Sequence, residues 1–305
     1  MATELTFPLV PRRRLIGLSF GSMHSARRGT GSDVAGSRPY LPGDDIDTID
    51  WSATARLSSA RDSDEFIVRE RYAEEAPRVL IVCDRRPEMA LYPAGLPWLR
   101  KPDAMRAAVD LIAESTLRAR GLVGYLDHAD DEAFWQSPRS QASFRAVRDD
   151  RLELDDFHAG QDNVTRALDH LEQAKGRLPA GSFVFVVSDF LVAPSEDSWA
   201  GLLGRWDVVP VVIQDPVWEA SFPDVSSVVV PLADPASGKL SYLRLTGAEA
   251  RDRRAANELR RQELISRFEA SGLDPVEIST SDRDEILMAF QEWAEGREYQ
   301  RMRGW

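Results

Sequence analysis

A run of apolar residues closed by a carboxylate decides the fold: Arg78-Val79-Leu80-Ile81-Val82-Cys83-Asp84. A strand that is buried on both faces has this composition, and its last residue carries a polar group to the edge of the sheet. A second stretch repeats the plan: Phe183-Val184-Phe185-Val186-Val187-Ser188-Asp189. Two parallel strands would place both carboxylates on one edge of an open α/β sheet, where such sheets bind ligands at a topological switch point.

Strand and helix patterns alternate through the C-terminal three-quarters of the chain. Strands are predicted at 122–126, 208–213 and 276–278, a short strand at 132–136 and a hairpin from 227–231 and 239–243. Helices are predicted after Pro102 and Gly160, at 139–153, 195–205 and 247–272, and around Ile286, Phe290 and Trp293. Pro210 favours an edge position or a bulge within its strand. The alternation predicts an α/β fold with a doubly wound, mostly parallel sheet.

The N-terminal segment has a different pattern. Apolar and polar residues alternate from Ile49 to Leu57, which predicts a half-buried strand. Residues 66–72 are predicted to return as its hairpin partner. The predicted organisation is therefore a β-rich segment at 1–76, an α/β domain at 77–296 and a C-terminal tail at 297–305.

Composition limits the classes of function. The 305-residue chain has a net charge of −12, whereas a nucleic-acid binder needs a basic surface. Cys83 is the one cysteine, which excludes a disulfide within the chain and fits a reducing compartment. No run reaches the ~18 apolar residues of a membrane span, and 15–20 is too short for a signal-peptide core. We therefore expect a cytoplasmic protein without a membrane span.

The motifs of common enzymes are weak in this chain. Gly17-Leu18-Ser19-Phe20-Gly21 matches the nucleophile-elbow pattern, but no buried strand precedes it. The sequence has no phosphate-binding G-x-x-x-x-G-K-[ST] loop, and its four histidines lack the spacing of a zinc site. With no activated nucleophile or general-base histidine in view, an enzyme ranks below a binding module.

Four carboxylates fall in three loops that should converge on the predicted sheet edge. They are Asp84, Glu88, Asp162 and Asp189. Oxygen ligands of this kind suit a hard divalent cation such as Mg²⁺. The alternative is an acidic edge that Arg85 or Arg86 neutralises.

These loops resemble those of the von Willebrand factor A domain. In that family a D-x-S-x-S loop, a threonine in a G-x-T setting and a later aspartate bind Mg²⁺, which a ligand carboxylate completes. This sequence keeps Asp84 and Asp189, but Arg86, Glu88 and Asp162 replace the two serines and the threonine. We therefore expect no metal, with the Arg86 guanidinium in the metal's place and paired with Asp84, Asp162 or Asp189. Mg²⁺ held with the help of Glu88 is the alternative.

A longer signature lies in the N-terminal segment. It comprises Arg38-Pro39-Tyr40-Leu41-Pro42-Gly43-Asp44-Asp45, Ile49-Asp50-Trp51, Thr54-Ala55-Arg56 and Val68-Arg69-Glu70. It resembles the bacterial domain-of-unknown-function family number fifty-eight over roughly residues 10–295. One departure is Asp47, where the family usually carries arginine. The resemblance implies a von Willebrand A-like sheet and a MoxR-type AAA+ ATPase as partner in protein assembly or metal insertion.

The signature mixes aromatic, cationic and acidic side chains, as docking surfaces do. The docking candidates are Arg38, Tyr40, Asp44, Asp45, Asp50, Trp51 and Arg56. Alternatively they brace the β segment, which is the preferred interpretation for Trp51 on the apolar face. The leading hypothesis is a non-enzymatic adaptor whose client protein is unknown. A metal-dependent hydrolase and a purely structural interaction protein are the alternatives.

Overall fold

A computed structural model describes residues 6–12, 23–40, 49–61, 66–91, 99–129, 132–138, 151, 157–225, 227, 229–234, 237 and 239–303. Within these ranges the side chains of residues 23–38, 57–61, 69–75 and 233 are not described. The nucleophile-elbow match, Asp44, Asp45 and nearly all of the helix predicted at 139–153 lie outside the described residues.

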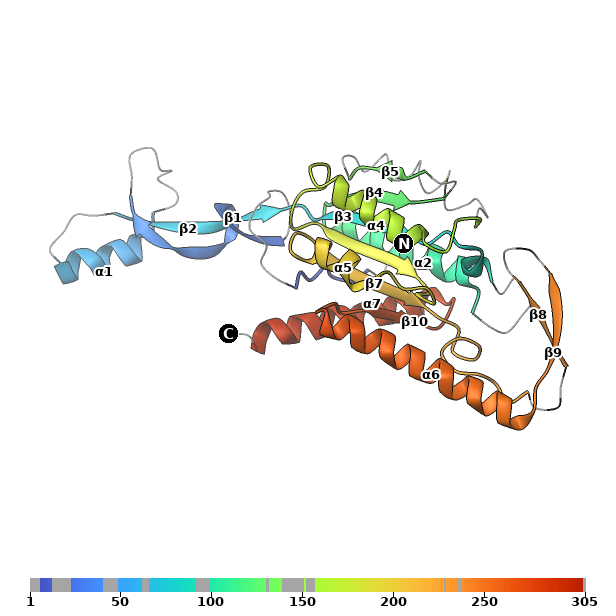
Figure 1. Ribbon diagram of the computed structural model, residues 1–305. Coiled ribbons are helices and arrows are strands. Elements are labelled where there is room, and N and C mark those ends of the chain that lie inside the picture. Colours follow the sequence, from blue (N-terminus) through green and yellow to red (C-terminus); the bar gives the residue numbers. More distant parts are fainter. Residues whose placement is uncertain are drawn as a thin grey trace, which may run out of the picture.

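A six-stranded sheet forms the centre of the molecule (Figure 1). Its strands are β3 (Arg78–Cys83), β4 (Leu122–Asp127), β5 (Phe134–Gln136), β6 (Phe183–Ser188), β7 (Asp207–Ile213) and β10 (Val276–Ile278). They lie in the order β10-β7-β6-β3-β4-β5, and only β5 pairs antiparallel to its neighbour. The predicted α/β class with a mostly parallel sheet is confirmed.

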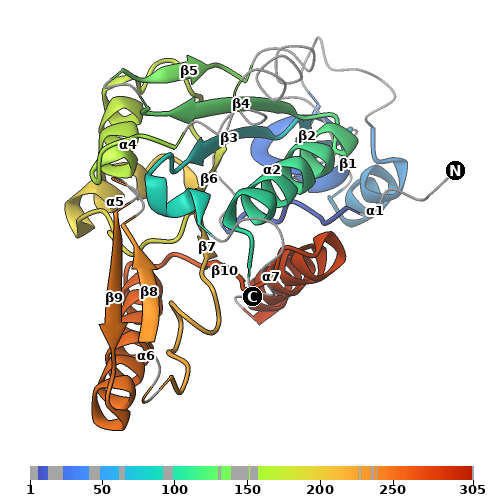
Figure 2. The same cartoon turned by 90° about the vertical axis from the view of Figure 1, so that its right-hand side faces the viewer.

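Helices cover both faces of this sheet (Figure 2). On one face lie α2 (Lys101–Arg118) and α7 (Arg283–Arg303); on the other lie α4 (Asn163–Gln173), α5 (Glu196–Leu203) and α6 (Gly247–Ala270). The alternation of side chains along β3 explains the two cores, because Val79 and Ile81 enter the first and Leu80 and Val82 the second. Strands buried on both faces need the uninterrupted apolar runs seen in the sequence.

The strand order reverses between β3 and β6. From β3 the chain builds outward through β4 to β5, and from β6 it builds the opposite way through β7 to β10. The connections leaving β3 and β6 therefore diverge, which makes the carboxyl ends of these two strands the topological switch point of the sheet. Asp84 and Asp189 directly follow them.

The N-terminal hairpin differs from the prediction. Strand β2 (Ile67–Glu75) pairs antiparallel with β1 (Met23–Pro39), and residues 51–61 form helix α1 (Trp51–Arg61). The strand predicted from Ile49 to Leu57 is therefore wrong, apart from one isolated bridge between Ile49 and Val68. Asp50 explains the helix, because its carboxylate accepts the Ala53 N–H at 3.0 Å and caps the first turn.

Two hairpins extend from opposite ends of the molecule (Figure 1). The β1–β2 hairpin and α1 lie beyond the amino ends of the sheet strands. The predicted hairpin of β8 (Val229–Ala233) and β9 (Leu240–Arg244) is confirmed and lies beyond their carboxyl ends. Within the described part of the chain, no helix combines the length and apolarity that crossing a bilayer requires.

Strand β7 carries Pro210 in the interior of the sheet, between β6 and β10. The pairing with β10 begins only at Val211, so at Pro210 the strand has a partner on one side only. Pro210 therefore lies in an interior strand, but at its own position it faces no strand on the β10 side. That is the local equivalent of the edge position expected for this proline.

Helix α7 anchors the first described residues of the chain. The Phe7 ring stacks on Phe290 with centroids 4.5 Å apart. Arg297 is buried, and its Nη1 donates at 3.0 Å to the Val10 carbonyl and to Asp207. Helix α7 continues through Arg303, so residues 297–303 of the predicted tail at 297–305 are helical, and Arg297 contacts Val10 in the N-terminal segment.

Candidate functional site

The carboxyl ends of β3 and β6 bring Asp84 and Asp189 together. The two strands pair in parallel up to Cys83 and Val187, and the Asp84 N–H continues the ladder to the Val187 carbonyl at 2.9 Å. Both aspartates are completely buried. Two carboxylates withdrawn from water need compensating charge, because an isolated buried ion is very costly.

Arg86 supplies that charge from the loop that follows β3. Its Nε and Nη2 donate to Asp84 Oδ2 at 2.9 and 2.5 Å, and Nη2 also reaches Asp189 Oδ1 at 2.5 Å. The Arg86 N–H donates to Asp84 Oδ1 at 2.9 Å, which holds the loop in this conformation. The guanidinium is 1 % exposed. It lies between the two aspartates that the von Willebrand A resemblance assigns to a metal ion.

Lys101 is a second buried cation in the same cluster, and sequence reasoning missed it. Its Nζ lies 2.8 Å from Asp189 Oδ2 and 2.5 Å from Glu219 Oε1. Glu219 in turn accepts the Asp215 N–H at 2.9 Å. One signal was available: Lys101 is the first residue of α2, where the helix dipole disfavours a cation. A lysine at that position indicates a compensating carboxylate nearby.

Neutral side chains complete the hydrogen bonds of the aspartates. Ser188 Oγ donates to Asp84 Oδ2 at 2.6 Å, and Asn163 Nδ2 donates to Asp84 Oδ1 at 3.0 Å. Gln214 Nε2 donates to the Asp189 carbonyl at 2.7 Å. The cluster therefore draws on the ends of β3, β6 and β7 and on the first turns of α2 and α4. Because hydrogen bonds from several elements converge on the two aspartates, the positions of these carboxylates are fixed.

The electrostatics of the cluster favour its charged form. Burial alone raises the pKa of Asp189, but the neighbouring charges of Lys101 and Arg86 outweigh it and hold that pKa below its ordinary value. Burial lowers the pKa of Arg86 and of Lys101, yet their carboxylate partners raise both above the usual range. The pKa of Glu219 is raised because burial exceeds the effect of Lys101. The two neighbouring cations thus keep Asp189 ionised despite its burial.

The other two carboxylates predicted for this site lie outside the cluster. Asp162 is exposed and pairs with Arg166 at 2.8 Å on the surface of α4. Glu88, in the 3-10 helix η2 (Pro87–Ala90), accepts Gln161 Nε2 at 2.7 Å. Gln161 is exposed, and its Oε1 is 3.4 Å from Arg86 Nη1. Gln161 and Glu88 therefore form the rim that separates the cluster from solvent.

The residues present do not fit a divalent cation. Among the described residues, no three His, Cys, Asp or Glu side chains are grouped to hold a metal ion. The oxygens of Asp84 that would face the ion already accept from Arg86, Ser188 and Asn163. Arg85, the other neutralising residue considered from the sequence, has its guanidinium 4.7 Å from the ring centroid of Phe157. Arg86, together with Lys101, therefore supplies the positive charge at this edge.

The described docking candidates of the N-terminal signature, which exclude Asp44 and Asp45, lie at the other end of the molecule (Figure 1). Trp51 is 61 % exposed and contacts Phe66 edge-to-face at 5.9 Å, and Tyr40 contacts Phe66 at 6.4 Å. Trp51 therefore lies on a helix with most of its side chain exposed, and its contact with Phe66 is the only ring contact that it makes among the described residues. Arg56 is exposed and donates from Nε to the Ser52 carbonyl at 3.1 Å. Arg38 pairs with Val68 through its backbone, and Asp50 caps α1.

Comparison with known proteins identifies the family. Residues 36–264 match the family described as "Protein of unknown function DUF58". The chain belongs to this family. No curated protein matches the sequence.

Two solved structures resemble this family member weakly. One is an aerotolerance-related membrane protein from Bacteroides fragilis with multiple mutations to serines, at 12 % identity and a TM-score of 0.38, covering 72 % of this chain and 99 % of that one. The other is the pilus adhesin SpaC from Lactobacillus rhamnosus GG, at 13 % identity and a TM-score of 0.35, covering 72 % of this chain and 30 % of that one. Likenesses at these TM-scores support no conclusion about function.

The lowered pKa of Asp189 predicts an acid limb in the stability of this family member. The unfolded state binds a proton at this residue near pH 3.9 and the folded state only at lower pH, so the stabilisation is present above about pH 4 and is lost as the pH falls further. Urea unfolding of wild type and Asp189→Asn at pH 7 and pH 3 tests this, because only the wild type can lose the contribution. Glu219 has a raised pKa, so its contribution to stability changes with pH in the opposite direction, and it does so in both proteins. Equal losses in the two proteins would contradict the assignment.

Proposed function

We propose that this protein is a non-enzymatic adaptor that works with a MoxR-type AAA+ ATPase in the assembly or maturation of a client protein. Recognition takes place at the Asp84/Asp189 edge of a doubly wound, von Willebrand A-like sheet. Arg86 replaces the metal ion, so the edge needs no cofactor. One observation carries this proposal: the buried guanidinium bridges the two strand-end aspartates, with 2.5 Å contacts to each.

The sealed cluster determines how such recognition works. Arg86, Asp84, Asp189 and Lys101 are all buried, so a partner protein does not reach them directly. It contacts the rim instead, where Gln161 is exposed at the start of α4 and other exposed groups follow β6. The cluster then acts as a rigid support that holds the rim loops in one conformation.

The ATPase partner rests on the family resemblance. The cytoplasmic location follows from that partner's need for ATP and from the single buried cysteine, Cys83. The acidic balance of the chain, with a sequence pI of about 4.9, supports a protein client over a nucleic acid.

The metal-free edge predicts that divalent cations do not bind. Titration of the purified protein with Mg²⁺ and with Mn²⁺ by calorimetry is expected to give no saturable heat, because Arg86 occupies the space between Asp84 and Asp189. Saturable binding that Asp84→Ala abolishes would contradict the proposal and favour a metal-dependent function. Turnover of generic phosphoesters by the Mg²⁺-loaded protein would then identify a hydrolase.

Recognition at the rim predicts that a charged substitution of Gln161 weakens partner binding. Gln161→Arg places a bulky cation over Arg86, so the affinity for the ATPase is expected to fall about tenfold or more. Gln262→Arg is the matched control, since Gln262 is an exposed glutamine on the distant surface of α6. ATP-dependent pull-down followed by fluorescence titration measures both variants. Wild-type affinity in Gln161→Arg would exclude this edge as the contact surface.

A further inference from the structure

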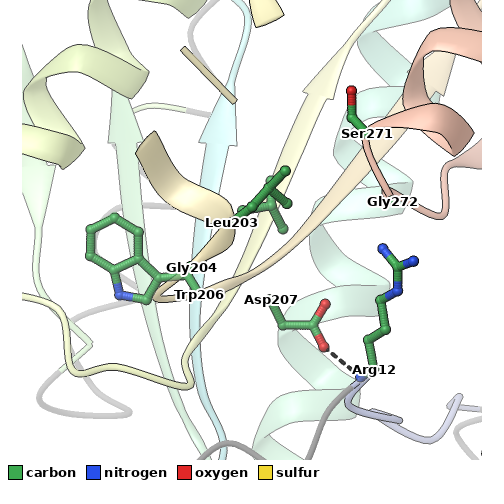
Figure 3. A pocket seen from close by; sticks show the side chains of 8 residues that line it. Arg12, Leu203, Gly204, Trp206, Asp207, Ser271 and Gly272 are labelled. Atoms are coloured by element: carbon green, nitrogen blue, oxygen red, sulfur yellow. Dashed lines mark hydrogen bonds between the residues drawn. The ribbon is translucent and has the colours of Figure 1, made fainter. Parts of the chain in front are cut away.

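A cavity of about 240 Å³ lies at the opposite, amino-terminal edge of the sheet (Figure 3). It is formed where α5 and α6 end and β7 begins. Its lining residues are Arg12, Leu203, Gly204, Trp206, Asp207, Val208, Ser271 and Gly272. Clefts for drug-sized ligands measure about 300–1,000 Å³, so this cavity suits a smaller molecule. It shares no residue with the Arg86 cluster.

The cavity offers an anion-binding group with spare capacity. Arg12 reaches it from the N-terminal segment, and its side chain is 37 % exposed. The nearest carboxylate oxygen, on Asp274, is 3.7 Å from Nε, so the described residues leave Nη1 and Nη2 without a close carboxylate. The guanidinium lies against Gly272, where an added Cβ would be 2.9 Å from Nη1. Figure 3 shows the Ser271 hydroxyl pointing away from the Arg12 guanidinium, so Arg12 alone supplies the anion-binding group.

The cavity also offers groups for a cation. Asp207 accepts the Arg12 N–H at 2.8 Å and Arg297 Nη1 at 3.0 Å, both on Oδ2. Its Oδ1 accepts no hydrogen bond from the described residues. Helices α5 and α6 both end at the cavity, at Leu203 and Ala270, and the carboxyl end of a helix carries a partial negative charge. A positively charged group at this place would therefore meet Asp207 Oδ1 and the two helix ends, while Arg297 stays paired with Oδ2.

We propose that this cavity binds a small zwitterion of the amino-acid class. Arg12 holds its carboxylate, and Asp207 with the two helix ends holds its ammonium group. The volume of about 240 Å³ suits a free amino acid. Leu203 supplies an apolar wall for a short side chain. This inference is independent of the adaptor function, which uses the other edge of the sheet.

The twenty amino acids, each at millimolar concentration, are the probes in a thermal-shift screen of the full chain. At least one is expected to raise the melting temperature, and its analogues lacking the carboxylate or the amine are expected to have no effect. For alanine these analogues are ethylamine and propionate. A screen in which no amino acid shifts the melting temperature would overturn the proposal, as would an equal response to either analogue.

Two variants test the location. Gly204→Leu fills the cavity from its lining, and its backbone (φ −75°) and surroundings accept a side chain because an added Cβ meets nothing within 4 Å. Gly176→Leu is the matched control, since its Cβ also meets nothing but lies outside the cavity lining. Binding must be lost in the first and kept in the second. Arg12→Gln must weaken binding about tenfold, as expected of a hydrogen bond to a charged group; unchanged binding in Gly204→Leu or Arg12→Gln would overturn the assignment.

Discussion

Asp189→Ala is expected to lower the free energy of unfolding by about 3–5 kcal/mol, the usual cost of removing one partner from a buried ion pair. Asp189 contacts Arg86 through Oδ1 and Lys101 through Oδ2, and both cations are buried. After the substitution Glu219 is the carboxylate left to Lys101, and Asp84 is the carboxylate left to Arg86. Two positive charges would then be buried with incomplete compensation, and the cavity left by the carboxylate adds to the cost.

Urea unfolding at pH 7, followed by circular dichroism, measures this effect. Asp162→Ala is the matched control, because Asp162 pairs with Arg166 on the surface and both side chains are about half exposed. Its effect is expected to stay within about 0.5 kcal/mol, as for most surface pairs. A loss below about 1 kcal/mol for Asp189→Ala would mean that water or relaxation compensates the two cations, and that the cluster is not the rigid support proposed above.

Arg86→Ser is expected to convert the metal-free edge into a magnesium site. The substitution removes the guanidinium and introduces a small neutral oxygen ligand between Asp84 and Asp189. Ser188 Oγ, already 2.6 Å from Asp84 Oδ2, offers a further oxygen. Oxygen ligands of this kind are those that Mg²⁺ prefers. Without metal the variant is expected to be destabilised, because the two carboxylates then face each other with Lys101 alone to compensate them.

Added Mg²⁺ should restore part of that stability. A ligand present at a hundred times its dissociation constant stabilises the folded state by about 2.7 kcal/mol. Arg86→Met provides the control, since it removes the charge but supplies no oxygen, and Mg²⁺ should leave its urea midpoint unchanged. If Mg²⁺ stabilised neither variant, the two aspartates would not be arranged for a cation, and the likeness of this edge to a metal site would be lost.

The sequence predicted the parts of the fold that depend on long apolar patterns. The runs ending at Asp84 and Asp189 predicted β3 and β6, because a strand buried on both faces must be apolar throughout. The spacing of Val164, Leu168 and Leu171 predicted α4, and all three side chains are buried. These patterns are reliable because burial of many large side chains leaves few alternative arrangements.

The error at residues 49–57 has the opposite cause. Small alanines at alternate positions fit a strand pattern, yet they bury little area and are also the best helix formers. Asp50 as an N-cap then decides in favour of α1. Burying the alternate residues as a strand would thus contribute little free energy, whereas the capping residue determined the local structure.

In the site, too, contacts between residues close in the sequence could be predicted, and contacts between distant residues could not. Arg86 lies two residues from Asp84, so a hydrogen bond within one loop was foreseeable, and the geometry places the guanidinium with Asp84 and Asp189 rather than Asp162. The Lys101–Glu219 contact joins two segments far apart in the sequence, and no periodicity relates them. Only the strand order, which brings the ends of β6 and β7 beside the start of α2, puts these residues together.

The identity of the cation at this edge has a consequence for control. A guanidinium that is covalently part of the chain has no dissociation constant, and a chelator cannot remove it. Its occupancy does not follow the free magnesium concentration of the compartment, and no ion must be acquired after synthesis. Under the proposed function the edge is therefore competent as soon as the chain has folded, and any regulation must act on the partner protein or on its supply.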